Sequence, residues 1–198
     1  MDAVLYIHEM GGTAAESEHY KPLFPDCGVV GLDYKSSTPW DAGVEIRATA
    51  AELCAEFDGI NLIANSIGAY YSMCAGIDDI VTKAYFISPI VDMERLITNM
   101  MTRANVTEND LRKQGTIRTA DRQELSWEYL SWVRCHPIKW TAPTEILYGS
   151  RDNLTDFDTI DSFAGRTGAR LTIMDGGEHW FHKDEQMRFL NNWILSNK

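Results

Sequence analysis

A short segment around Ser66 constrains the fold more than any other part of the sequence. The apolar run Ile60–Ala64 leads into the serine, and Gly68 stands two positions after it. The residues from Ala69 onward favour a helix over a second strand. A serine between small residues on a strand–turn–helix segment is typical of a nucleophile elbow. Small neighbours are required because strand end and helix start nearly touch; Ala64 stands where a glycine is more usual.

Further apolar and β-branched runs predict five more strands, which alternate with helices. The predicted strands are Val4–Ile7, Val29–Leu32, Thr82–Ser88, Glu145–Tyr148 and Leu171–Met174. Helices are predicted near residues 14–20, from residue 38 onward, and over 156–164 and 185–196. This alternation implies a mainly parallel sheet covered by helices on both faces. We therefore predict an α/β protein of about six strands, in a single domain that spans residues 1–198.

The helix predicted after residue 38 has clear start signals. Thr38 is a capping residue, Pro39 stands at the first helical position, and Asp41 supplies a carboxylate three residues after the cap. Apolar residues then recur at helical spacing. The sequence predicts that this helix buries the face formed by Val44, Ala48, Ala51 and Ala55.

The pattern changes between Pro89 and Trp140. A stripe at helical spacing comes first, formed by Met93, Leu96, Ile97, Met100 and Met101. A short helix is predicted from Thr107–Asp110 to about Gly115, a small hairpin over 116–126, and a last helix over 127–134 that Pro137 stops. We interpret residues 89–140 as a helical insertion.

The acidic composition restricts the partners. The chain has 29 Asp and Glu against 18 Lys and Arg, a formal net charge of −11. Such a surface repels nucleic acid and anionic membranes, so neither is expected as a partner. The first residues lack the basic region of a signal peptide, and no stretch reaches transmembrane length. We expect a cytoplasmic protein; the sequence gives no oligomeric state.

No cofactor or metal is expected. The sequence contains no metal-ligand spacing, no phosphate-binding loop and no dinucleotide fingerprint. The four cysteines are widely spaced and form no C-x-x-C pair. We interpret them as reduced core thiols: Cys27, Cys54, Cys74 and Cys135.

Ser66 needs a base to take its proton, and that base usually needs an acid to orient it. Gly149–Asp152 follows one predicted strand, and Gly176–His179 follows the next. In a parallel sheet these loops emerge at the same edge as the turn of Ser66. Each residue has a structural alternative, since Ser66 and Asp152 could cap helices and His179 could be a surface residue. Three such residues in nucleophile–acid–base order favour a catalytic triad.

Other residues compete for these roles. His182 is a second candidate base, although it lies where the closing helix should begin. Asp92 and Asp156 are alternative acids, but each precedes a predicted helix and is placed to cap it. His8 is expected to shape its own loop.

Over nearly its whole length the chain resembles an α/β-hydrolase, without the first two strands of larger members. The matching segments are His8–Gly12, Asp33–Tyr34, Ala64–Gly68, Gly149–Asp152 and Gly177–Trp180. The resemblance implies a serine hydrolase that cleaves small-molecule carboxylic esters of small or medium acyl chains through an acyl-enzyme. It also implies an oxyanion hole formed by the backbone N–H groups of Met10 and Ile67. The same triad serves thioesterases and amidases, and a catalytically silent binding module is the alternative from another class.

The resemblance further implies a cap in the insertion. Its methionines and tryptophans are either plain packing or the apolar underside of that cap. In the second case Met100 and Trp127 would contact substrate, with Tyr34 and Trp40 on the opposite side. Glu9 departs from the glycine that many relatives carry there and brings a carboxylate close to the entrance.

Overall fold

The computed structural model describes residues 1–120 and 122–198. The chain divides into two compact units. The first, here called the sheet unit, consists of Met1–Val91 and Lys139–Lys198. The second, here called the insertion, is Asp92–Ile138. Its bounds fall inside the predicted range of 89–140, and its role as a cap stays a prediction.

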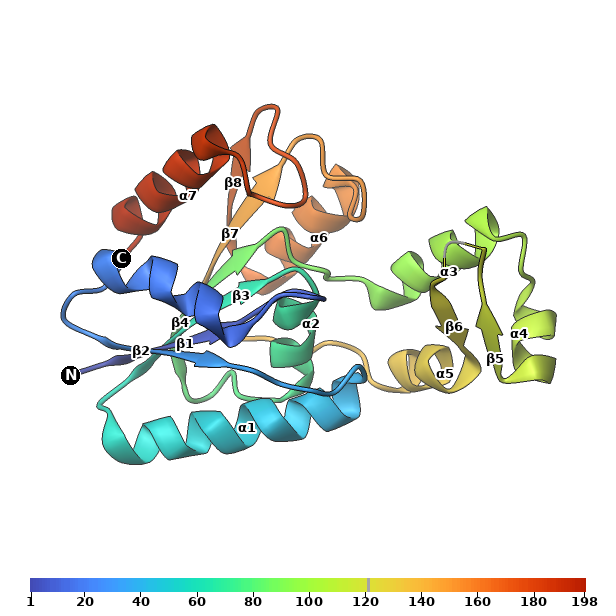
Figure 1. Cartoon of the computed structure of the whole chain (residues 1–198), viewed down its shortest axis with the longest axis horizontal. Coiled ribbons are helices and arrows are strands. Elements are labelled where there is room, and N and C mark those ends of the chain that lie inside the picture. Colours follow the sequence, from blue (N-terminus) through green and yellow to red (C-terminus); the bar gives the residue numbers. More distant parts are fainter. Residues whose placement is uncertain (121) are drawn as a thin grey trace. The chain divides into compact units, whose positions relative to one another are not determined.

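Six parallel strands form the sheet of the sheet unit, in the order β2-β1-β3-β4-β7-β8 (Figure 1). The register aligns Asn65 with Ile87 and Gly149 with Met174, so the carboxyl ends of neighbouring strands share one edge. The α/β prediction is confirmed, and each predicted strand matches to within one residue. The strands are β1 Ala3–Ile7, β2 Gly28–Leu32, β3 Ile60–Asn65, β4 Val81–Ile87, β7 Thr144–Gly149 and β8 Arg170–Met174.

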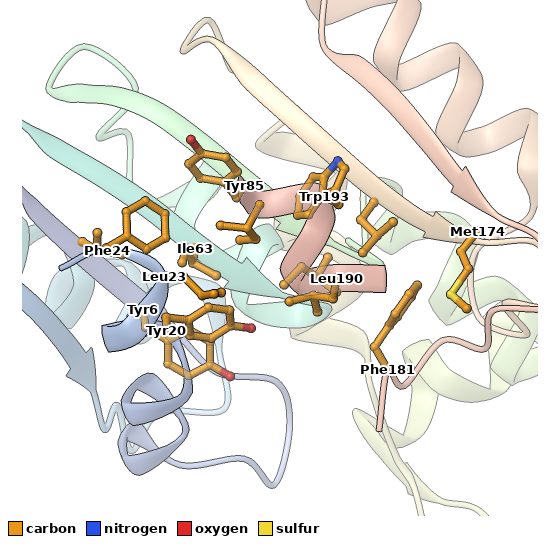
Figure 2. Close-up of a cluster of buried hydrophobic side chains, with 14 residues drawn as sticks. Tyr6, Tyr20, Leu23, Phe24, Ile63, Tyr85, Met174, Phe181, Leu190 and Trp193 are labelled. Carbon is orange, nitrogen blue, oxygen red and sulfur yellow. The ribbon is translucent and has the colours of Figure 1, made fainter. Parts of the chain in front are cut away.

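Two elements pack on one face of this sheet, the 3₁₀ helix η1 (Ala14–Leu23) and helix α7 (Asp184–Ser196). Side chains of alternate strand residues meet both elements in a buried cluster (Figure 2). His19 of η1 also donates a 2.7 Å hydrogen bond from Nε2 to Asn191 Oδ1 of α7. The cluster includes Tyr6, Ile63, Tyr85, Leu147 and Met174 from the sheet, Tyr20, Leu23 and Phe24 from or beside η1, and Leu190, Trp193 and Ile194 from α7.

The other face carries α1 (Pro39–Glu56), α2 (Ile67–Cys74) and α6 (Phe157–Thr167). Side chains alternate across a strand, so Tyr148 and Ile7 point away from the cluster of Figure 2. The Tyr148 ring lies 6.4 Å from that of Phe157 of α6. Helix α2 begins against Ile7, and α1 packs beside α2. The sheet is therefore covered on both faces.

The predicted buried face of α1 is wrong. Val44, Ala48, Ala51 and Ala55 are exposed, and Val44 is 68% exposed. The helix instead buries Ala42, Ile46, Ala50 and Leu53. This face places two long aliphatic side chains in the core, where they remove more apolar surface from water than alanines do. The helix begins at Pro39 as predicted, but the Thr38 hydroxyl donates to the Asp41 carboxylate (2.8 Å) rather than accepting from the backbone.

The prediction of core thiols is also wrong. All four cysteines are free thiols, but Cys54 and Cys135 are exposed and Cys27 and Cys74 are half-buried. Burial raises the pKa of Cys74 to about 11. Among residues 1–120 and 122–198, no helix combines the length and apolarity needed to span a membrane.

The insertion follows its predicted elements closely. Its helices are α3 (Met93–Arg103), α4 (Glu108–Gln114) and α5 (Trp127–Cys135). A short hairpin of β5 (Thr116–Arg118) and β6 (Glu124–Ser126) connects α4 to α5. Each helix has a side-chain cap, which explains why its start was readable from sequence: Asp92, Thr107 and Ser126 accept backbone N–H groups.

Candidate active site

Ser66 lies on a sharp turn between β3 and α2. Its φ of 48° and ψ of −116° fall in a region that non-glycine residues rarely adopt, at a cost of about 1–3 kcal/mol. Backbone hydrogen bonds hold the turn, since Ser66 N donates to Ile87 O (3.0 Å) and Ile90 N donates to Ser66 O (3.1 Å). The side chain makes no capping hydrogen bond, so the helix-cap alternative for Ser66 is wrong.

Gly68 makes this turn possible. A Cβ atom at this position would lie 2.5 Å from the carbonyl oxygen of His8 and 2.7 Å from that of Ile7. Both distances are far below a van der Waals contact, so any side chain would push α2 away from the end of β1. The close approach also brings the loop that contains His8 next to the turn of Ser66.

Asp152 is positioned by a contact between two loops. Gly149, at the end of β7, lies so close to Gly177 that a Cβ atom would meet the Gly177 backbone at 2.5 Å. Arg151 N donates to Gly177 O (2.8 Å), which fastens the loop after β7 to the loop after β8. Gly149 is thus needed because two backbones touch.

The Asp152 carboxylate is fully buried and accepts three hydrogen bonds. Oδ1 accepts from the backbone N–H groups of Leu154 (2.8 Å) and Thr155 (3.0 Å). Oδ2 accepts from His179 Nδ1 at 2.7 Å. A buried carboxylate is stable only when hydrogen bonds replace its hydration, and here they also fix its orientation.

His179 connects Asp152 to Ser66. Its Nδ1–H points to Asp152, so Nε2 is free to accept the Ser66 hydroxyl, and Nε2 and Oγ lie 2.8 Å apart. The sequence predicted that these three residues would lie together, and the structure places them in one hydrogen-bonded row. Such a row can transfer the serine proton to the imidazole while the carboxylate stabilises the resulting charge.

The competing residues are occupied elsewhere. Asp92 Oδ1 accepts from Arg95 N (2.9 Å) at the start of α3, and Asp156 Oδ1 accepts from Thr159 N (3.0 Å) at the start of α6. His182 is exposed and stacks on Trp180, with ring centroids 4.1 Å apart. Both aspartates therefore cap helices, as the sequence predicted.

His8 is buried and shapes its loop. Its Nδ1 hydrogen-bonds Glu9 O at 2.7 Å, and its ring stacks on Tyr34 at 4.3 Å between centroids. Tyr34 in turn donates its hydroxyl to His8 O at 3.0 Å. These contacts fix the loop that contains the predicted oxyanion donor Met10.

The two predicted oxyanion donors lie in the turn after Ser66 and in the loop after β1. Ile67 is the first residue of α2, and an N–H group at a helix start has no partner within the helix. Met10 lies in a turn that Gly12 N closes by donating to Glu9 O (3.0 Å), with Gly11 at a φ of 81°. The role of both N–H groups stays a prediction.

A pocket of about 320 Å³ opens beside Ser66 and His179. Most of its walls come from β1, η1, the loop after β8 and α7, and these walls were not predicted from the sequence. The sequence contained one indication of these walls, because the helix predicted near residues 14–20 follows β1 at the sheet edge where Ser66 lies. The other lining residues are Tyr6, Glu9, Glu16, His19, Tyr20, Asn65, Ile87, Trp180, Phe181, Met187 and Leu190.

Two carboxylates in this pocket differ in their surroundings. Glu16 accepts hydrogen bonds from the Tyr6 hydroxyl (2.6 Å) and from Thr13 N (3.0 Å). Glu9 is half-buried, and no hydrogen bond or ion pair to its carboxylate is found in the described part of the chain. Burial raises the pKa of Glu9; nearby His179 opposes this shift, and Glu16 reinforces it.

The predicted substrate-binding residues are not among the described residues that line this pocket. Tyr34 is buried against His8, and Trp40 is half-buried at the second position of α1. Met100 and Trp127 belong to the insertion, where Arg112 lies over the Trp127 ring at 5.8 Å. The contact of Met100 and Trp127 with substrate stays a prediction. Across residues 1–120 and 122–198, no cluster of three His, Cys, Asp or Glu residues is arranged to hold a metal ion.

Comparison with known proteins identifies the architecture. No protein-family model and no curated protein sequence matches the chain. Among solved structures, Est1E from Butyrivibrio proteoclasticus matches with a TM-score of 0.76 at 16% identity, over 99% of this chain and 86% of that one. Mouse alpha/beta hydrolase domain-containing protein 10 gives 0.73 at 17% identity, over 98% and 88%. A monoacylglycerol lipase from Paleococcus ferrophilus gives 0.66 at 14% identity, over 98% and 94%.

These proteins differ too much in sequence to carry an activity over to this chain. What they share with it is the arrangement of strands and helices over almost the full length. The all-parallel sheet, the strand-to-helix turn at Ser66 and the structural matches together confirm that the chain has the α/β-hydrolase fold.

Proposed function

We propose that this protein is a serine hydrolase that cleaves carboxylic esters of small or medium acyl chains through an acyl-enzyme. One observation carries the proposal: a serine on a strained turn, 2.8 Å from an imidazole nitrogen whose ring a buried carboxylate orients. Elements distant in sequence bring the serine, the histidine and the aspartate together, and a serine with a purely structural role does not require such an arrangement. The names of similar structures, an esterase and a lipase among them, agree with this chemistry.

In the proposed reaction the Ser66 oxygen attacks the ester carbonyl while His179 Nε2 takes the serine proton. Negative charge develops on the carbonyl oxygen, where the N–H groups of Met10 and Ile67 stabilise it. The imidazolium then gives its proton to the leaving alcohol, and the acyl group remains on Ser66. Water attacks the acyl-enzyme with the same histidine as base, which releases the acid. Asp152 holds the imidazole and stabilises its positive form.

The alternative from another class is a catalytically silent module that binds a ligand in the pocket. Glu9 is the residue in its favour, because a carboxylate beside the predicted oxyanion donors opposes the negative charge of a tetrahedral intermediate. A fluorophosphonate probe separates the two functions, since only an activated serine reacts quickly with it.

The test compares the native protein with Ser66→Ala and with Ser37→Ala, which removes an exposed serine outside the pocket. We expect rapid labelling of the native protein and of Ser37→Ala, and none of Ser66→Ala. Ester turnover should fall by roughly 10⁴-fold or more in Ser66→Ala. Normal labelling of Ser66→Ala, or no labelling of the native protein, would contradict the proposal. Graded p-nitrophenyl esters and thioesters then define the acyl chain and the leaving group.

A further inference from the structure

The charge distribution of the pocket beside Ser66 is one-sided. Two of the residues that line it, Glu9 and Glu16, carry carboxylates, and no lysine or arginine is found among the described lining residues. The histidines of the pocket are engaged elsewhere, because His179 bonds Asp152 and His19 bonds Asn191. Among the described lining residues, the pocket therefore has two acidic groups and no permanent cation.

The partners of Glu16 are electrically neutral. A tyrosine hydroxyl and a backbone N–H hold its two oxygens in place without cancelling its charge. Glu9 lacks even neutral partners among the described residues, although it is half-buried. Burying a carboxylate without a partner is costly. A neutral acyl chain in this pocket would bury Glu9 further and would therefore bind with a less favourable free energy. A cation in the same place would remove that cost.

Aromatic rings complete the pocket. Tyr20 forms part of one wall, and Trp180 and Phe181 come from the loop that also carries His179. His182 stacks on one face of the Trp180 ring, but the residue remains 59% exposed, which is unusual for a tryptophan. Aromatic faces attract cations through their quadrupole, and they attract ammonium groups in particular. Carboxylates and aromatic walls in one cavity thus favour the same kind of ligand.

We propose that this pocket selects ester substrates that carry an ammonium group, with Glu9 as the main counter-charge and Glu16 and the aromatic rings as additional attraction. The inference rests on the proposed ester hydrolysis for its reaction. The charged group belongs to the acyl part or to the alcohol part of the ester, and the experiment distinguishes these.

Two isosteric ester pairs test the charge alone. Choline butyrate and 3,3-dimethylbutyl butyrate differ in one atom of the alcohol part, where nitrogen replaces carbon. The p-nitrophenyl esters of 4-(trimethylammonio)butyrate and 5,5-dimethylhexanoate make the same exchange in the acyl part. In at least one pair we expect kcat/KM of the native protein to favour the cation by about tenfold. Added NaCl should lower that ratio.

Matched variants assign the effect to Glu9. Glu9→Gln should lower the cation-to-neutral ratio by about tenfold. Glu18→Gln removes the same formal charge from η1, but Glu18 is exposed, pairs with Lys21 and lies outside the pocket. It should leave the ratio unchanged, because surface charge is screened. A ratio near one in both pairs for the native protein would overturn the inference while leaving ester hydrolysis intact.

A binding measurement covers the case in which neither ester of a pair turns over. Calorimetry with Ser66→Ala should show tighter binding of choline butyrate than of 3,3-dimethylbutyl butyrate, or the same preference in the acyl pair. That preference without turnover in the native protein would support the cation pocket and contradict the proposed function. Equal binding within both pairs, or no binding of either cation, would overturn the inference.

Discussion

The sheet unit and the insertion are stabilised in different ways. In the sheet unit, β1 is wholly buried, and the cluster of Figure 2 continues from η1 across the sheet to α7. In the insertion, the described buried apolar side chains form a small set: Met93, Ile97, Met101, Leu111, Leu125 and Leu130. Helix caps and the ion pairs of Arg134 with Glu94 and Glu108 supplement them. Exposed ion pairs contribute little, about 0–1 kcal/mol each.

An aspartate in each unit illustrates this difference in stabilisation. In the sheet unit, Asp152 is held under His179 by a contact between two loops. In the insertion, Asp92 accepts the N–H of Arg95 and completes a helix start. Both are aspartates that follow a strand of the sheet. The first orients the His179 imidazole because tertiary packing surrounds it, whereas the second accepts an N–H group of the helix that it precedes.

The largest effect we expect separates these two aspartates. Asp152→Asn should lower ester turnover at pH 7.5 by roughly 10⁴-fold with little change in melting temperature, because an amide favours the wrong tautomer of His179. Asp92→Asn should keep most turnover and lose about 1 kcal/mol or less of stability. Kinetics and thermal melts with one ester check both variants. An inactive Asp92→Asn beside an active Asp152→Asn would reverse the assignment.

Core truncation should show whether the two units unfold together. Leu130 is fully buried in the insertion, and Ile63 is fully buried in β3. Replacing either by alanine should cost about 2–5 kcal/mol where it packs. We expect Leu130→Ala to reduce hydrogen-exchange protection within residues 92–138 and leave β3 and β4 protected, whereas Ile63→Ala reduces protection of the strands. Equal loss over the whole chain in Leu130→Ala would show a single cooperative unit.

If the insertion is a cap, its side chains should affect selectivity more than rate. Trp127→Ala or Met100→Ala should change the relative rates on short and long acyl esters by up to about tenfold, since a few methylene contacts are worth that much. Glu128→Ala, at an exposed position beside Trp127, is the control. Loss of rate by one common factor on every ester would exclude a role in selectivity.

The smallest effect we expect comes from replacing a glutamate by glutamine. This substitution should change the melting temperature in opposite directions in the two units. Burial raises the pKa of Glu9 above its ordinary value of 4.5, so the charged carboxylate is less favourable in the folded protein than in the unfolded chain. The charged form therefore costs stability at neutral pH, and Glu9→Gln should raise the melting temperature slightly at pH 7.5. Glu94→Gln removes a partner of Arg134 and should lower it slightly.

The pH dependence provides the check on Glu9. As the pH falls through the raised pKa of Glu9, the native carboxylate becomes neutral and its cost disappears. The rise in melting temperature caused by Glu9→Gln should therefore vanish below about pH 4.5, where the native glutamate is as neutral as the glutamine. The groups that act on Glu9 are His8, Glu16 and His179. A rise in melting temperature that persists at low pH would show that the charge of Glu9 is not its cause.

The sequence alone determined the helices and strands and the three candidate site residues. Parallel strands buried on both faces read as continuous apolar runs, and the residues after them meet at one edge of the sheet. Ser66, Asp152 and His179 could therefore be identified from their places after predicted strands. The helices of the insertion were equally readable, because Thr107 and the other capping residues are local signals.

Only the tertiary structure decided which faces are buried and what forms the pocket. The buried side of α1 depends on the sheet beneath it, and the sequence favoured Val44 where packing selected Ile46 and Leu53. The pocket walls come from η1 and α7, about 170 residues apart along the chain, and their side chains meet only because both helices pack on one face of the sheet. Local sequence specifies backbone conformation, but a cavity depends on how distant surfaces fit together.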